Sequence, residues 1–177
     1  MRARIWLAIE AALLCGCVGL RAWQDSLPTC VLREADATLD LAGGCVDGVC
    51  LGDPFSSAVQ AWGAPGCTTT PDTISCNFMN GVFVDVVRHG ARDTPADDDA
   101  ASCLIVAVPY QGVTPDGLGP GESIACFIDA LGQPDAHGYD WGNTATWMSP
   151  NVGVRDAPAP TAGDGLADTV AMPATCP

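Results

Sequence analysis

Two short segments of the chain share one pattern of apolar and polar positions. Apolar residues that recur every three or four positions form one face of a helix. Segments 52–66 and 121–135 meet this spacing with two sets of residues: Phe55, Val59 and Trp62, and Ile124, Phe127, Ile128 and Leu131. Each segment therefore predicts a short amphipathic helix. Because a helix of about ten residues is marginal in isolation, each must pack its apolar face on a sheet.

Start and stop signals border both predicted helices. Asp53 precedes Pro54 as a helix cap followed by proline at the first helical position, and Ser123 or Glu122 can cap the second helix. Gly63 and Gly132 follow the apolar stripes, and each has a proline two residues later. Glycine can adopt the backbone conformation that ends a helix, and proline prevents its continuation.

Runs of β-favouring residues flank the two helices. They are residues 38–41, 78–79 and 81–87 around the first, and 106–110, 147–148, 151–155 and 170–173 around the second. The two helical segments lie 69 positions apart without a gap and share several glycine, aspartate and proline positions. We therefore expect an α+β fold of two tandem copies, 36–102 and 103–177, each with one helix and about three antiparallel strands. The helices should cover one face of the sheet.

The stretch CVDGVC, residues 45–50, predicts a hairpin and a disulfide. Asp47-Gly48 is a favoured two-residue turn, so Val46 and Val49 form the closing pair of the hairpin. Cys45 and Cys50 are then the next, closely spaced pair, where a cross-strand disulfide fits.

The remaining cysteines suggest three further disulfides. Leaving out Cys15 and Cys17, eight cysteines follow the leader: Cys30, Cys45, Cys50, Cys67, Cys76, Cys103, Cys126 and Cys176. Cys67 and Cys76 can bridge the turn TTTPDTIS, Cys103 and Cys176 border two related strand segments, and Cys30 is left for Cys126. No pair has the tight spacing of a zinc site, so the pattern favours disulfides in an oxidising compartment.

The N-terminus has the pattern of an export signal. Residues 1–16 begin with Arg2 and Arg4, continue through a short apolar run and end before Cys17 in Leu-Cys-Gly-Cys. This is typical of a bacterial lipoprotein signal peptide, with Cys17 as the lipidated residue and residues 17–35 as a tether. The alternative is an N-terminal amphipathic helix of a cytosolic protein.

The glycine-bordered helices and their flanking strands resemble two families. Gly followed by an acid, an amphipathic helix and Gly-x-Pro is similar to outer-membrane assembly lipoproteins of the SmpA/OmlA type. The tandem arrangement over about Thr38 to Pro173 resembles more closely the β-lactamase inhibitor protein family. Asp53-Pro54 and the many cysteines depart from both, so no binding residues are transferred. This resemblance implies an envelope protein or an inhibitor of a secreted enzyme.

The net charge and the absence of known motifs reduce the number of function classes that fit the chain. The chain has 21 acidic and 7 basic residues and a formal net charge of −14, which disfavours nucleic-acid binding. No nucleophile elbow, zinc-protease helix, phosphate loop or dinucleotide fingerprint occurs. We therefore expect no catalytic residues, no metal and no cofactor, and we interpret Asp97-Asp98-Asp99 as a solvated loop.

The segment HGYDWGN supplies a candidate binding patch. His137, Tyr139 and Trp141 alternate, so a strand or hairpin would place their three rings on one face. They either cover the core of the sheet or form a recognition patch, since Tyr and Trp dominate binding hot spots.

Together these features predict a non-catalytic, exported lipoprotein that binds a protein or a cell-envelope component. It would be anchored in a bacterial envelope through lipid only, or secreted. A bacterial source is suggested by the absence of lysine in a chain rich in Ala, Gly, Asp and Pro. The alternatives are an inhibitor of a secreted or periplasmic enzyme, and a hydrolase without a recognisable motif.

Overall fold

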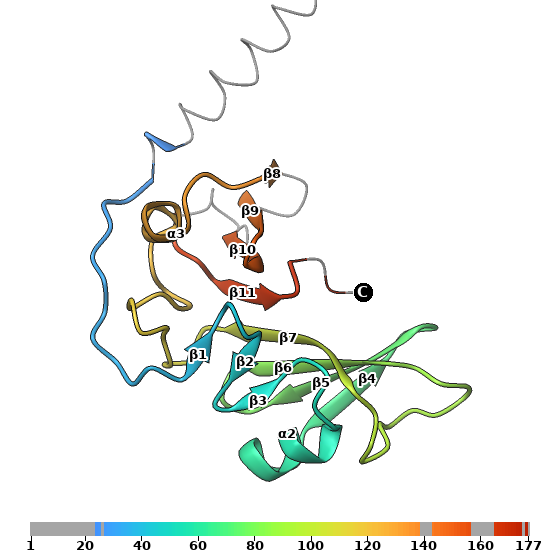
Figure 1. The fold of residues 1–177 in the computed structure, drawn as a ribbon. Coiled ribbons are helices and arrows are strands. Elements are labelled where there is room, and N and C mark those ends of the chain that lie inside the picture. The colour runs from blue at the N-terminus through green and yellow to red at the C-terminus, as the bar shows by residue number, and fades with distance from the viewer. Residues whose placement is uncertain (1–23, 26, 139–142, 157–164, 175, 177) are drawn as a thin grey trace, which may run out of the picture.

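The computed structural model describes residues 24–25, 27–138, 143–156, 165–174 and 176 (Figure 1). The elements follow in the order β1 (Leu39–Asp40), β2 (Cys45–Val46), β3 (Val49–Cys50), α2 (Phe55–Trp62), β4 (Gly66–Thr69), β5 (Thr73–Phe78), β6 (Val82–Val87), β7 (Ala101–Ala107), α3 (Ile124–Leu131), β8 (Ala136–Gly138), β9 (Asn143–Met148), β10 (Asn151–Asp156) and β11 (Thr169–Met172). Strands therefore dominate the described part of the chain.

The strands form two antiparallel sheets. β1, β2 and β3 make a small three-stranded sheet, and the other strands make one eight-stranded sheet in the order β4-β5-β6-β7-β11-β10-β9-β8. The large sheet is continuous because β11 pairs with β7, with Val170 opposite Val106. The pairing of β6 with β7, with Val84 opposite Leu104, joins the predicted first copy (36–102) to the second (103–177) through backbone hydrogen bonds.

The predicted fold class, an α+β fold of two tandem helix-plus-strand copies, is wrong. The described part of the chain is mostly β, with one eight-stranded sheet, a separate three-stranded sheet and the eight-residue helices α2 and α3, rather than two helix-plus-strand repeats. Segments that match in sequence have different roles, since residues 38–41 contribute β1 of the small sheet and residues 106–110 contribute the end of β7. Local similarity could not reveal which strands would pair.

The two helices themselves occur where the apolar spacing predicts them. Gly63 and Gly132 follow them with φ of 84° and 82°, and their N–H groups bond to Val59 O and Ile128 O. Ser123 caps α3, because its Oγ accepts a hydrogen bond from Ala125 N. The predicted cap at Asp53 is wrong. Its Oδ2 accepts from Cys50 N instead and closes the turn that precedes α2.

β4 and much of β5 are not among the predicted strands, because TTTPDTIS has the residues of a turn. Only the middle of that segment forms a turn. The residues on either side of it pair across a hairpin, with Thr68 opposite Ser75 and Thr69 opposite Ile74. Threonine is β-branched and favours strands, so the tertiary sheet extends through it.

Aromatic rings attach each helix to the sheet. Phe55 and Trp62 of α2 lie 6.3 and 5.2 Å, centroid to centroid, from Phe78 of β5. Phe127 of α3 lies 6.4 Å from Trp147 of β9, and Trp147 also donates a hydrogen bond to Gly132 O at 2.9 Å. These side chains belong to one continuous apolar core.

Four disulfides link the described cysteines. The pairs are Cys30–Cys126, Cys45–Cys50, Cys67–Cys76 and Cys103–Cys176, the same pairs that the cysteine analysis suggested. Disulfides persist where thiols are oxidised, so the folded chain belongs to an oxidising, extracellular environment.

The predicted leader (1–16) and the predicted lipidation residue Cys17 lie outside the described residues. Neither helix in the described ranges combines the length and apolar character needed to cross a bilayer.

Candidate functional site

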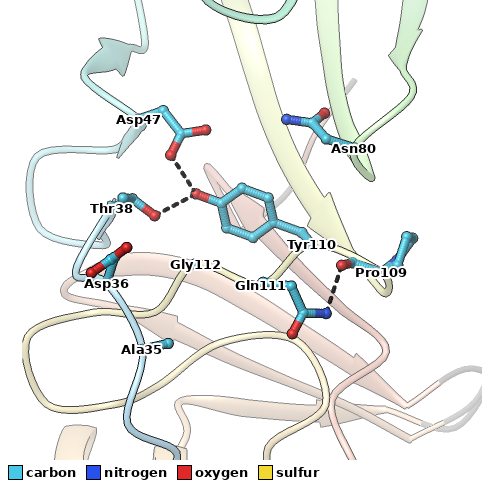
Figure 2. A pocket seen from close by; sticks show the side chains of 9 residues that line it. All are labelled: Ala35, Asp36, Thr38, Asp47, Asn80, Pro109, Tyr110, Gln111 and Gly112. Atoms are coloured by element: carbon cyan, nitrogen blue, oxygen red, sulfur yellow. Dashed lines mark hydrogen bonds between the residues drawn. The ribbon is translucent and has the colours of Figure 1, made fainter.

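A cleft of about 600 Å³ lies where the small sheet, the N-terminal segment and the end of β7 meet (Figure 2). Its lining residues are Ala35, Asp36, Thr38, Asp47, Asn80, Pro109, Tyr110, Gln111 and Gly112. They come from four separate parts of the sequence, so the cleft exists only in the folded chain. Its volume is within the range of sites that bind small molecules.

The hairpin turn places Asp47 in the lining of this cleft. Asp47 and Gly48 have φ of 49° and 82°, as a two-residue turn between β2 and β3 requires. Val46 pairs with Val49 and Cys45 with Cys50, which confirms the predicted hairpin. Asp47 N also donates to Thr38 O at 2.7 Å, so the turn is attached to the chain just before β1.

The carboxylate of Asp47 joins three elements by hydrogen bonds. The Tyr110 hydroxyl donates to Oδ1 at 2.9 Å, and Trp62 Nε1 of α2 donates to Oδ2 at 2.8 Å. Thr38 Oγ1 lies 2.8 Å from Tyr110 Oη. Because the tyrosine proton goes to Asp47, the Thr38 hydroxyl is the donor in that bond. Figure 2 shows the Thr38–Tyr110–Asp47 chain along the cleft.

Tyr110 is held in its neutral form. The side chain is 5% exposed, and this burial, reinforced by the neighbouring Asp47 carboxylate, raises the pKa of Tyr110 to about 12, although the hydrogen bond from Thr38 opposes the shift. A hydroxyl with this pKa is a poor proton acceptor or nucleophile at neutral pH. The arrangement is therefore suited to binding by shape and hydrogen bonds.

Gly112 allows the tyrosine and the threonine to meet. A Cβ atom at this position would overlap Thr38 Oγ1 and Tyr110 Oη. Any residue larger than glycine would therefore displace the hydrogen-bonded pair that forms the floor of the cleft.

The N-terminal segment, residues 27–38, forms one wall of the cleft and is tied down along its length. Cys30 is bonded to Cys126 of α3, and the Ser123 hydroxyl donates to Pro28 O at 2.7 Å. Arg33 Nε lies 3.3 Å from Glu122 Oε1. Glu122 is 6% exposed, and this burial raises its pKa while the Arg33 charge opposes the shift. The wall is therefore held by one covalent and one ionic link.

Two exposed apolar residues directly precede residues that line the cleft. Met79 is 98% exposed in the turn between β5 and β6, and Val108 is 56% exposed just after β7. Their neighbours Asn80 and Pro109 line the cleft. The two turns are fused, because Ala107 N donates to Gly81 O at 2.9 Å and Tyr110 N donates to Ala107 O at 2.8 Å. We call Met79 and Val108 together the apolar rim.

The cleft is negatively charged. A second cavity of about 630 Å³ shares Thr38 and Asp47 with the first and adds Asp40 to its lining. Asp36, Asp40 and Asp47 are thus the charged groups among the lining residues of the two cavities, and no arginine lines either one.

The predicted binding patch lies largely outside the described residues. His137 belongs to β8, half-buried and opposite Ala145 of β9, and burial lowers its pKa. Tyr139 and Trp141 are among residues 139–142, which the structure does not describe. The hypothesis that these rings form one patch therefore stays a prediction.

The acidic loop before β7 is partly neutralised by arginines. Arg92 Nη2 lies 3.0 Å from Asp99 Oδ1, and Arg88 Nη2 lies 3.0 Å from Asp93 Oδ1. The backbone hydrogen bond from Ala96 and the Arg92 charge lower the pKa of Asp99, with burial opposing. Across the described ranges, no group of three or more His, Cys, Asp or Glu residues is placed to hold a metal ion.

The sequence patterns did not indicate Thr38 or Tyr110 as site residues, nor the hydrogen bonds of the Asp47 side chain. Asp47 was identified only as a turn residue, and nothing in the local sequence around Tyr110 links it to a residue 63 positions away. The one available signal was a lone tyrosine at the end of a predicted strand.

We expect Tyr110→Phe to lower the free energy of unfolding by about 1 kcal/mol, because Thr38 and Asp47 each lose a hydrogen-bond partner. Urea unfolding at neutral pH measures this loss. Gln111→Leu, at an exposed lining residue, is the control and should change the stability little. Equal stability of Tyr110→Phe and the wild type would show that the hydrogen-bond chain does not hold the elements together.

No protein-family model, curated protein or solved structure matches the chain. The functional interpretation therefore depends on the geometry of the site.

Proposed function

We propose that the chain is an exported, non-catalytic binding protein whose partner is another protein. Its contact surface would be the apolar rim of Met79 and Val108 with the adjoining Tyr110 cleft. The proposal includes a lipid anchor at Cys17 and a bacterial envelope location, both supported by the sequence pattern of residues 1–17 alone.

The observation that carries this proposal is the exposure of the apolar rim on fixed backbone. Met79 is 98% exposed although it follows the fully buried Phe78. The turn hydrogen bond from Gly81 N to Phe78 O at 3.2 Å and the bond from Ala107 N to Gly81 O hold the rim in place. Because the backbone beneath these side chains is already ordered, binding does not have to order it again, which favours their use as contact residues.

The cleft beside the rim supports the same function. Asn80 Oδ1 accepts from Val82 N, which leaves its amide N–H groups for a ligand, and Gln111 Nε2 donates to Pro109 O, which leaves Oε1 as an acceptor. With the Asp36 carboxylate, these groups offer hydrogen-bond donors and acceptors around a cleft of about 600 Å³. Partner binding would place apolar contacts on the rim and polar contacts in the cleft.

Site-specific photo-crosslinking tests this contact surface. A photoreactive amino acid is placed at Met79, and in a control variant at Met148, which is 68% exposed at the β9–β10 turn, at the opposite end of the strands from Met79. In native envelope or culture fluid we expect one discrete crosslinked partner from position 79 and none from position 148.

The same partner should be lost when Val108→Asp is added to the crosslinking variant at position 79, because a charge on the rim opposes its burial. Crosslinks from position 148 alone would place the contact surface near β8 and β9 instead. Identical bands from both positions would contradict a specific surface at the rim.

A further inference from the structure

Strand β4 leaves one edge of the large sheet open. It is the first strand in the sheet order and pairs only with β5, and Figure 1 shows it at the border of the sheet. Gly66, Thr68 and Thr69 are exposed, and Cys67 is half-buried. An open edge presents backbone groups that can pair with another strand.

The register of the β4–β5 hairpin shows which backbone groups face outward. Thr70 N donates to Thr73 O at 2.9 Å, so Thr70 and Thr73 form a hydrogen-bonded pair. Hydrogen-bonded and non-hydrogen-bonded pairs alternate along an antiparallel ladder. Thr69 and Cys67 therefore occupy non-hydrogen-bonded positions, and their N–H and C=O groups point away from β5.

The disulfide at this position gives independent support. The Cα atoms of Cys67 and Cys76 are 4.1 Å apart. Non-hydrogen-bonded antiparallel pairs have the shorter Cα separation of about 4.5 Å, against about 5.5 Å for hydrogen-bonded pairs. In the part of the chain that the structure describes, no backbone hydrogen bond reaches the N–H or C=O of Cys67 or Thr69.

We propose that this edge is a self-association surface, on which β4 pairs antiparallel with β4 of a second copy of the chain about a two-fold axis through Thr68. Cys67 then lies opposite Thr69 of the second copy, and Thr69 opposite its Cys67. Each of these residues can exchange two main-chain hydrogen bonds with its opposite residue. The two sheets become one continuous sheet across the axis.

A second copy fits this edge because the strand is self-complementary and uncharged. Residues 66–70 read GCTTT, so no side chain repels its counterpart across the axis. Pro65 and Pro71 border the strand, which limits pairing to these few residues. Contacts this small give weak, reversible association.

The salt dependence of association distinguishes this dimer from an interface held by charge attraction. Each copy carries a formal net charge of −14, so two copies repel each other through the solvent. Salt screens that repulsion while leaving the backbone hydrogen bonds nearly unchanged. The dimer should therefore strengthen as salt rises, whereas a complex held by opposite charges weakens.

Sedimentation equilibrium of the purified, oxidised chain tests the proposal. At protein concentrations from about 10 µM to about 1 mM, we expect reversible dimerisation that tightens between about 0.05 M and about 0.5 M NaCl. A mass that stays monomeric throughout, or dimerisation that weakens with salt, overturns the proposal.

A charge swap at Thr68 tests the register. Thr68→Asp and Thr68→Lys each place two like charges together on the axis, so each should weaken dimerisation by about fivefold. An equimolar mixture should recover the wild-type affinity as a heterodimer. Thr29→Asp, which adds the same charge on the exposed N-terminal segment, is the matched control. Failure of the mixture to recover overturns the two-fold register.

Thr69→Pro tests the outward N–H directly. Proline removes this donor without removing a bond to β5, so the fold should stay intact while dimerisation falls by about tenfold or more. Near-ultraviolet circular dichroism checks the fold. An intact fold with unchanged dimerisation overturns the proposal.

Discussion

Removal of the disulfide between Cys30 and Cys126, by replacing both cysteines with alanine, is expected to lower the free energy of unfolding by about 4 to 5 kcal/mol. The two residues are 96 positions apart, so this bond restricts the unfolded chain more than any other of the four. The bond also anchors the N-terminal wall of the cleft to α3. Urea unfolding at neutral pH, with comparison of midpoints and slopes, measures the loss.

The disulfide between Cys45 and Cys50 is the matched control for this effect. It closes a separation of only 5 residues, so its replacement by two alanines should cost about 2 kcal/mol. Amide hydrogen exchange should also rise in residues 27–38 of the first variant, since their anchor is lost, but not in the second. Equal losses from the two pairs would contradict the dependence on loop length.

Replacement of Asp85 by asparagine is expected to raise the free energy of unfolding by about 1 to 3 kcal/mol at neutral pH. Asp85 is on β6 and is only 6% exposed, and its Oδ1 has no hydrogen-bond partner. Burial raises the pKa of Asp85, and the hydrogen bond from Ser75 only partly opposes this shift. At neutral pH the charged carboxylate therefore lowers the stability of the native state.

The pH dependence follows from the direction of this shift. Because the pKa of Asp85 is higher in the folded chain than in the unfolded chain, the native state binds the proton more readily. The wild type should regain stability as pH falls through the folded pKa towards the usual aspartate value of about 4. The advantage of Asp85→Asn is therefore present at neutral pH and disappears in acid.

Stability curves of the two proteins between pH 4 and pH 8 test this dependence. Asp129→Asn, the same change at an exposed position of α3, is the control and should move stability little at any pH. An advantage of Asp85→Asn that is constant over the whole pH range would show that burial of the charge is not its cause.

Local signals predicted the helices and the first hairpin because their physics is local. The apolar spacing of Phe55 and Trp62, and the glycine at position 63, act within a few residues of each other. In the same way, Asp47-Gly48 requires positive φ and so determines that Cys45 lies opposite Cys50. These features could be derived without knowledge of the rest of the chain.

The sheet could not be derived in this way. The threonines of β4 and β5 carry a turn-like proline and aspartate between them, and their strand pairing depends on β6 beyond them. The pairing of β11 with β7 joins residues such as Val170 and Val106, which are far apart in the sequence, and it completes one eight-stranded sheet in place of separate repeats. Strand order is decided by long-range packing, for which one sequence offers many near-equivalent choices.

The sequence by itself determined the positions of both helices, the Asp47-Gly48 turn and a set of eight cysteines suited to an oxidising compartment. Only the tertiary structure decided that the strands form one eight-stranded sheet and that Tyr110, Thr38 and Asp47 meet in a cleft. Capping, turn conformation and apolar periodicity act over a few residues. The pairing of β7 with β11 and the hydrogen bond from Tyr110 to Asp47 require contacts across more than 60 positions, which arise only when the whole core is packed.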